Sequence, residues 1–232
     1  MRTEASKDVE GLPALESANS GFIVHITPVE ELDDVRLENT RGGSYLNATQ
    51  STTTGNRCTT GFTMHDVTNS NRRGVSTAGH CASDTPQRWY RNHNSSSWSA
   101  HVRQEWHVGQ NGDIGWYGSN NSLPQFYASW GGVRNVTGSA RPVVGQRLWF
   151  FGTGNASTGQ QTATVAANGN CASNRCNLTA MDSNVTVPGD SGGPWFSGNT
   201  AYGVHCCTVG SLSNFTPVYV FSNLWGMVVT RA

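Results

Sequence analysis

The sequence predicts an all-β fold, and three features predict it. From Arg41 onward, short apolar or alternating runs are separated by clusters of Gly, Asn, Ser and Thr, which is typical of a β-barrel or β-sandwich. Charged residues make up only 13% of the chain, against roughly 25% in ordinary soluble domains. Only the last part, residues 222–230, has the apolar spacing of an amphipathic helix.

Individual elements follow from the same patterns. The predicted helix begins with Ser222 as its cap and places Leu224, Trp225, Val228 and Val229 on one face. Representative predicted strands span residues 58–67, 145–152, 162–167 and 202–205.

Residues 1–36 differ from the rest because Asp and Glu cluster there and Cys and Trp are absent. We interpret this segment as a leader or the remnant of a pro-segment. Within it, residues 21–27 form a β-branched run that predicts one strand, followed by a short helix from Pro28.

Charge and cysteine content restrict the partners. Lys plus Arg and Asp plus Glu both number 15, so no basic field would gather a nucleic acid. No apolar run approaches the roughly 20 residues that span a bilayer, so no membrane partner is expected. The cysteines lack the paired spacing of a zinc site, which predicts disulfides, an oxidising compartment and no metal. They are Cys58, Cys81, Cys171, Cys176, Cys206 and Cys207.

The strongest chemical signal is the segment GDSGGP at residues 189–194. Glycines around a serine let the backbone turn tightly and aim two N–H groups at one point, where they can hold an oxyanion. The hydroxyl of Ser191 would need a neighbouring imidazole to take its proton. A candidate is His80, in the segment STAGHC at residues 76–81, at the end of a predicted strand over 74–78.

Together these two motifs resemble those of the chymotrypsin-like serine peptidases. The flanking sequence is most similar to the bacterial secreted branch, which includes streptogrisins and glutamyl endopeptidases, and the resemblance extends from Arg41 to the C-terminus. It implies two six-stranded antiparallel Greek-key β-barrels with a C-terminal helix, and a triad in the chain order His, Asp, Ser. We therefore expect a first barrel at residues 37–125 and a second, carrying Ser191, at residues 126–232.

The resemblance also selects the acid of the triad. Asp84 lies in the loop of His80, and Asp190 adjoins Ser191. Asp113 is favoured over Asp182 because NGDIGW, residues 111–116, resembles the family's short strand with a buried Asp. Its expected role is to hold the histidine tautomer and stabilise the imidazolium.

The same resemblance assigns the oxyanion donors to the backbone N–H groups of Gly189 and Ser191. It implies that Asp190 is buried and ion-paired beneath the loop. Its partner is not evident from the sequence, and Arg141 and Arg147 are candidates.

The specificity pocket should be lined by residues 185–188 and 203–208. Val185 falls at its base, where no acidic residue stands, so a Lys or Arg side chain would be buried without a counter-charge. Thr186 and His205 resemble the glutamyl endopeptidases, and an imidazole with a hydroxyl can donate to a substrate carboxylate. Glu is therefore the expected residue before the cut bond, with Asp weaker.

Two more positions, Cys206 and Thr208, belong to the same predicted pocket lining. The alternative is that His205 is a core histidine and that the pocket accepts small or apolar side chains.

The resemblance implies a disulfide between Cys58 and Cys81. Cys171 and Cys176 are close enough to close a small loop. The adjacent Cys206 and Cys207 would then pair with each other or stay unpaired. A bridge from Cys171 or Cys176 to the pocket strand remains open.

The sequence thus predicts a secreted, monomeric serine endopeptidase that acts on polypeptides and needs no cofactor. Two other interpretations remain: a catalytically silent relative that binds protein or glycan, and an enzyme held as a zymogen by residues 1–36. Glu38, just before residues 39–43, is a site that a Glu-cutting enzyme could cleave in itself.

Overall fold

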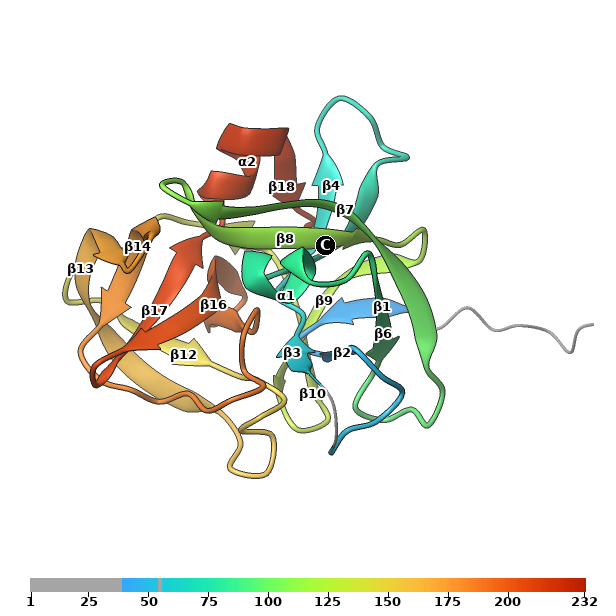
Figure 1. Ribbon diagram of the computed structural model, residues 1–232, viewed down its shortest axis with the longest axis horizontal. Coiled ribbons are helices and arrows are strands. Elements are labelled where there is room, and N and C mark those ends of the chain that lie inside the picture. Colours follow the sequence, from blue (N-terminus) through green and yellow to red (C-terminus); the bar gives the residue numbers. More distant parts are fainter. Residues whose placement is uncertain (1–38, 54–55) are drawn as a thin grey trace, which may run out of the picture. The chain divides into compact units, whose positions relative to one another are not determined.

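The computed structural model describes residues 39–53 and 56–232. The described part is mostly β-strand with short helices, which confirms the predicted fold class (Figure 1). The predicted leader at 1–36, with its strand at 21–27 and its helix from Pro28, lies outside the described residues, and so does Glu38.

In the described part of the chain, the first barrel is built from seven strands between residues 45 and 118. They are β2 (Tyr45–Asn47), β3 (Arg57–Thr59), β4 (Thr63–Asp66), β5 (Arg73–Thr77), β6 (Gln87–Arg91), β7 (Ser99–Gly109) and β8 (Gly112–Gly118). Their order in the sheet is β4-β5-β8-β7-β6-β2-β3. Because β3 and β4 are successive parts of one interrupted strand, this order returns to its start and closes an antiparallel barrel. The position of β6 beside β2 gives the Greek-key order.

The second barrel closes in the same way. Its strands are β12 (Arg147–Phe150), β13 (Gln161–Ala172), β14 (Arg175–Met181), β15 (Pro194–Ser197), β16 (Thr200–Val209) and β17 (Leu212–Pro217). The order β16-β15-β12-β13-β14-β17 is closed by pairing of β16 with β17. In Figure 1 these yellow to red strands lie beside the blue to green first barrel.

Five further strands of the described residues lie outside these two strand orders. They are β1 (Thr40–Gly42), β9 (Ser122–Ser129), β10 (Gly132–Asn135), β11 (Gly138–Ser139) and β18 (Met227–Val229). Two of their pairings, β1 with β9 and β11 with β16, are parallel, in addition to the antiparallel barrels that were predicted. The boundary predicted between residues 125 and 126 falls within β9, and the division of the chain there stays a prediction.

The C-terminal helix is present, but its predicted limits of 222–230 are wrong. Helix α2 spans Tyr219–Trp225 and ends at Gly226, whose φ of 68° is left-handed and whose N–H donates to the Ser222 carbonyl. The next residues form β18, Met227–Val229, which pairs with β4 of the first barrel. Its valines are β-branched, so the strand that was available overrode the helical spacing.

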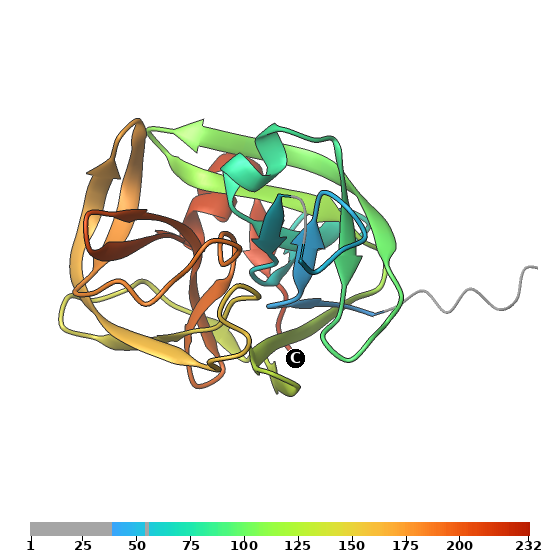
Figure 2. The same cartoon turned by 60° about the horizontal axis from the view of Figure 1, so that its bottom comes forward.

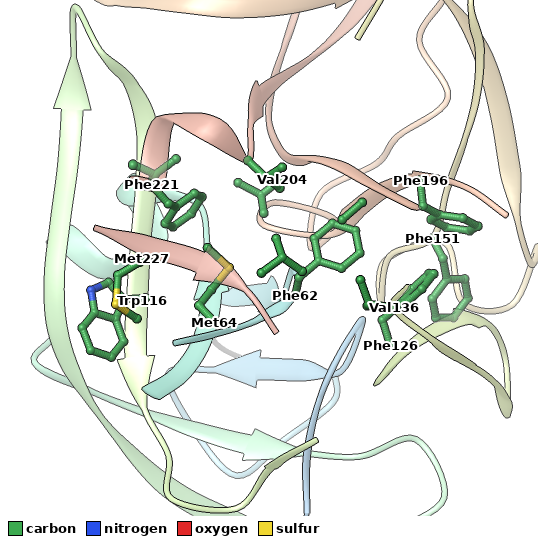
Figure 3. Packing of buried hydrophobic residues seen from close by; sticks show 14 of the residues in the cluster. Phe62, Met64, Trp116, Phe126, Val136, Phe151, Phe196, Val204, Phe221 and Met227 are labelled. Atoms are coloured by element: carbon green, nitrogen blue, oxygen red, sulfur yellow. The ribbon is translucent and has the colours of Figure 1, made fainter. Parts of the chain in front are cut away.

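The main apolar core is shared by the two barrels. Figure 3 shows Phe62 and Met64 of the first barrel packed in the same cluster as Phe196 and Val204 of the second. All four are fully buried, and burying one such side chain stabilises the fold by about 1.5–3 kcal/mol. The relative placement of the barrels is therefore fixed by packing, and this matters because the predicted catalytic residues are divided between them.

Candidate active site

His80 is carried by a short helix that the sequence did not predict. Helix α1, Gly79–Ser83, begins directly after β5 and lies against β7 and β8 (Figure 1). A side chain at Gly79 would place its Cβ 2.1 Å from the His107 carbonyl oxygen and 2.9 Å from Asp113 Oδ1. Only glycine allows the helix to start this close to the strand that carries Asp113.

Asp113 is the second residue of β8, and its side chain is fully buried. Oδ1 accepts the backbone N–H of His80 at 2.7 Å, and Oδ2 lies 2.7 Å from His80 Nδ1. The Asp113 amide donates to Thr216 Oγ1 at 3.0 Å, which ties the strand to the second barrel. One carboxylate thus holds both the backbone and the ring of the histidine, and this fixes the orientation of the ring.

Ser191 lies in a turn held between the barrels. Its carbonyl accepts the amide of Thr59 from β3 at 2.7 Å, and the next amide, of Gly192, donates to the His205 carbonyl of β16 at 2.7 Å. Gly192 has a φ of 89°, and a Cβ there would lie 2.2 Å from the Thr59 carbonyl oxygen, so this position requires glycine.

Ser191 and His80 lie near each other. Among the described residues, however, they do not form a hydrogen bond with each other. The sulfur of Cys81 lies 3.8 Å from His80 Nε2 and 3.8 Å from the Ser191 carbonyl oxygen. Catalytic hydrogen bonds are often long before a substrate binds, and they tighten in the complex. The His80 side chain is 33% exposed, so a substrate can reach it.

The turn leaves two amides available. Asp190 donates its N–H to the Val187 carbonyl at 3.1 Å, and Gly193 donates to the Asp190 carbonyl at 2.9 Å. Within the described residues, the amides of Gly189 and Ser191 donate to no acceptor. These are the two groups predicted to hold an oxyanion.

Asp190 is fully buried beneath the turn, as predicted, but its partners are polar and uncharged. Its carboxylate accepts the Asn155 amide at 3.0 Å, the Asn155 side chain at 2.6 Å and the Val187 amide at 2.8 Å. The suggested partners lie elsewhere: Arg141 stacks on the ring of Tyr219, and Arg147 donates to Thr162.

Burial raises the pKa of Asp190 to about 6, against the lowering effect of these hydrogen bonds. The folded protein therefore holds this proton more tightly than the unfolded chain does. The stability that Asp190 contributes by binding this proton is fully present below the unfolded pKa of about 3.9 and is lost as the pH rises through about 6. The loss is worth about 3 kcal/mol in the free energy of unfolding.

We expect Asp190→Asn, which cannot ionise, to be less stable than the unmodified protein at pH 4, because its NH2 group must face a donor. The deficit should shrink by about 3 kcal/mol by pH 7. Denaturant unfolding of both proteins at each pH measures this difference in the free energy of unfolding.

Asp182→Asn, at an exposed position, is the matched control. Backbone hydrogen bonding from Thr164 lowers the pKa of Asp182, so this substitution should give a loss of stability that grows with pH. A deficit for Asp190→Asn that is constant with pH would contradict the assignment.

The predicted pocket residues Thr186 and Thr208 lie together. Their hydroxyls are 3.3 Å apart, and Thr186 Oγ1 is 3.1 Å from the hydroxyl of Ser213. All three hydroxyls contact Asn184 Oδ1 at 3.0 to 3.3 Å. The sequence did not point to Ser213 or Asn184, because nothing in β17 or in the loop before Val185 marks them as neighbours.

His205, on β16, is 3% exposed and packs against Phe150 and Trp195, with ring centroids 5.4 Å and 6.5 Å apart. Burial lowers the pKa of His205 to about 3, so its imidazole is neutral at ordinary pH. Its Nδ1 atom is buried and has no hydrogen-bond partner among the described residues. The backbone of His205 contacts the turn of Ser191 through the Gly192 amide. Its neutral ring, however, cannot supply a positive charge there.

The cysteines pair as Cys58–Cys81, Cys171–Cys176 and Cys206–Cys207. The first pair joins β3 to α1 beside His80 and is the one that the resemblance implied. The second closes the β13–β14 hairpin, so the alternative bridge to the pocket strand is not formed. The third lies within β16, between His205 and Thr208.

One residue near Asp113 was missed by the sequence analysis. Arg175 Nε lies 2.8 Å from Asp113 Oδ2. An arginine among the four residues between two cysteines carries no motif, and its contact depends on how the β13–β14 hairpin folds over β8.

Other parts of the described surface offer little to compare with this site. A hollow of about 420 Å³ lies on the first barrel, between Thr40 and Trp116, and contains none of the residues predicted to be catalytic. Among the described residues, no group of three or more His, Cys, Asp or Glu is arranged to hold a metal ion. In the same residues, no helix has the length and apolar character to cross a membrane.

A family model described as trypsin matches residues 41–224. The chain belongs to the trypsin family. It is thus a chymotrypsin-like serine protease, and its fold is that of a trypsin-family domain. None of the curated proteins compared with the chain matches it.

Solved structures agree on the trypsin-family fold. Protease A of Thermobifida fusca is 24% identical, with a TM-score of 0.65 over 83% of this chain and 98% of its own. A glutamic acid specific serine protease that uses a histidine triad in substrate binding is 24% identical, with a TM-score of 0.64 over 82% of this chain and 100% of its own. A Nocardiopsis protease is 22% identical, with a TM-score of 0.65 over 84% of this chain and 100% of its own.

Proposed function

We propose that the chain is a secreted endopeptidase in which Ser191 attacks the peptide carbonyl, His80 takes and returns the proton, and Asp113 orients the imidazole. The amides of Gly189 and Ser191 hold the oxyanion of the tetrahedral intermediate, and water then releases the acyl group. The observation that carries this proposal is the pair of 2.7 Å contacts between Asp113 and His80. Three disulfides are consistent with an oxidising compartment.

We further propose that the enzyme cleaves after Glu, and after Asp more weakly. The support is a polar group of hydroxyls, from Thr186, Thr208 and Ser213, at the predicted pocket. Thr208 is exposed, whereas Thr186 is only 6% exposed. A substrate carboxylate that reaches Thr208 would therefore meet hydroxyl donors at the exposed end of this polar group. A hydrogen bond to a charged group is worth about 1.5–3 kcal/mol.

His205 would act in this pocket as a neutral donor. The glutamic acid specific relative is described as using a histidine triad, whereas the ring contacts of His205 among the described residues are with Phe150 and Trp195. The hydroxyl groups would therefore carry more of the recognition here. The same aromatic surroundings favour the alternative, a pocket that accepts small or apolar side chains.

The test is digestion of a denatured protein, with the residue before each cut identified by mass spectrometry. We expect cuts to be enriched after Glu, with fewer after Asp. Enrichment after Leu, Phe or Ala would replace the Glu assignment with the alternative and leave the triad untouched. Absence of cuts before and after removal of residues 1–36 would favour the silent binding relative.

A variant pair tests the pocket itself. Thr208→Val should lower kcat/KM for a Glu peptide about tenfold relative to an Ala peptide of otherwise identical sequence. Thr200→Val, at the other end of the same strand β16, is the matched control and should leave that ratio unchanged. Equal ratios for the two variants would contradict a role for the Thr208 hydroxyl.

A further inference from the structure

The carboxylate of Asp113 has a second cationic neighbour. Arg175 Nε lies 2.8 Å from Oδ2, the same oxygen that is 2.7 Å from His80 Nδ1. Asp113 is fully buried, while the side chain of Arg175 is 26% exposed. Arg175 Nε has no hydrogen-bond partner among the described residues, so its N–H is not directed at this oxygen. The contact is therefore an ion pair, and the directed hydrogen bond of Oδ2 belongs to His80.

The hairpin that carries Arg175 is held in place. Arg175 opens β14 and pairs with Ala172, and the Cys171–Cys176 disulfide closes the loop around it. The hairpin is tied to α2 by a hydrogen bond of 3.2 Å from Tyr219 to Asn177. Figures 1 and 2 show its tip beside the β7–β8 hairpin, and β14 contacts both strands.

The charges around the pair are few. From β14 comes Arg175, whose guanidinium is charged at every working pH. His205 on β16 is neutral. Thr216 on β17 accepts the Asp113 amide with its hydroxyl. From β7 comes His107, whose Nε2 accepts the Asn111 amide at 3.3 Å. Among the described residues, Arg175 is thus the permanent cation facing the Asp113–His80 pair.

This cation has two physical effects. A buried carboxylate without a cation would be costly, so Arg175 stabilises the carboxylate of Asp113. When His80 carries a proton, two cations share one carboxylate oxygen, which disfavours the protonated ring. The first effect holds the carboxylate that orients the ring, and the second keeps His80 available as a base at lower pH.

We propose that Arg175 is a positioning residue of the active site, which anchors the Asp113 carboxylate and extends activity toward acidic pH. This inference rests on the proposed triad. Arg175 is not a catalytic residue in this account, because it acts through Asp113 and His80.

The experiment is the pH profile of kcat/KM for Arg175→Met and Arg175→Gln in the full chain. The midpoint of the acidic limb should rise by about half to one pH unit in both, since the neighbouring positive charge is lost but was partly screened by solvent. Arg175→Lys keeps the charge and should restore a midpoint near that of the unmodified enzyme. Arg147→Gln, an exposed arginine on β12, is the matched control and should leave the midpoint unchanged.

The outcomes separate this inference from the proposed function. An active unmodified enzyme whose acidic midpoint does not move in the Met and Gln variants would overturn the role of Arg175 alone. A lower kcat/KM at all pH values, with an unmoved midpoint, would also overturn it, because a merely structural role gives that result. An unmodified enzyme in which Ser191 or His80 can be replaced without loss would instead defeat the triad.

Discussion

Replacing Ser191 with Ala should lower kcat/KM for peptide hydrolysis by about 10⁴- to 10⁶-fold, because the account assigns the nucleophile to its hydroxyl. The substitution removes one oxygen from a half-buried position and leaves in place the backbone bonds of the turn, from Thr59 and to His205. The loss should therefore fall on kcat, with binding and folding little changed. Steady-state kinetics on one peptide and a thermal unfolding scan measure the two effects.

Ser222→Ala is the control for the serine substitution. Ser222 is exposed on α2, away from the turn, and uses its backbone carbonyl to cap the helix. Its variant should retain full activity. Activity of Ser191→Ala within tenfold of the unmodified enzyme would show that another group is the nucleophile.

The second large effect is expected for Asp113→Asn, at about 10⁴-fold in kcat. The His80 backbone N–H can only donate, so the amide oxygen of the substituted side chain must face it in place of Oδ1. The NH2 group then faces His80 Nδ1 in place of Oδ2 and forces that nitrogen to accept. The ring proton then sits on Nε2, the nitrogen that must accept the proton of Ser191. The ring is therefore held in the wrong tautomer.

Asp182→Asn is the matched control for this substitution, because Asp182 was the other aspartate considered for the triad. It is exposed and accepts the Thr164 amide at 2.9 Å, on the outer surface of the second barrel. Its variant should keep activity within about twofold, since surface substitutions have small effects. A large loss in Asp182→Asn together with normal activity in Asp113→Asn would reverse the choice of acid.

Much of the fold was predictable from short-range patterns. Clusters of Gly, Asn, Ser and Thr mark the turns, and β-branched runs mark the strands, so the all-β class and several strands follow from residues alone. The arrangement as two barrels came from the resemblance. The end of the chain was predicted less well, because the apolar spacing of residues 222–230 suits a helix, whereas Gly226 stops α2 and β4 offers Val228 and Val229 a strand to pair with.

The site was predictable where one motif holds both the chemistry and the backbone geometry. GDSGGP and STAGHC are of this kind, and so the sequence alone is enough to propose His80 and Ser191 as catalytic residues. The partners of Asp190 and the presence of Arg175 beside Asp113 were not, since each depends on a loop from a distant strand. Long-range contacts of single polar residues leave no periodic trace in a sequence.

The most direct test of the account is reaction of the chain with a serine-directed phosphonylating reagent, followed by mass spectrometry of its peptides. The account predicts loss of activity in step with a single adduct on Ser191, and no adduct when His80 is replaced by Ala, because the hydroxyl then lacks its base. Inactivation with the adduct on another residue, or full peptidase activity with Ser191 unmodified, would contradict it.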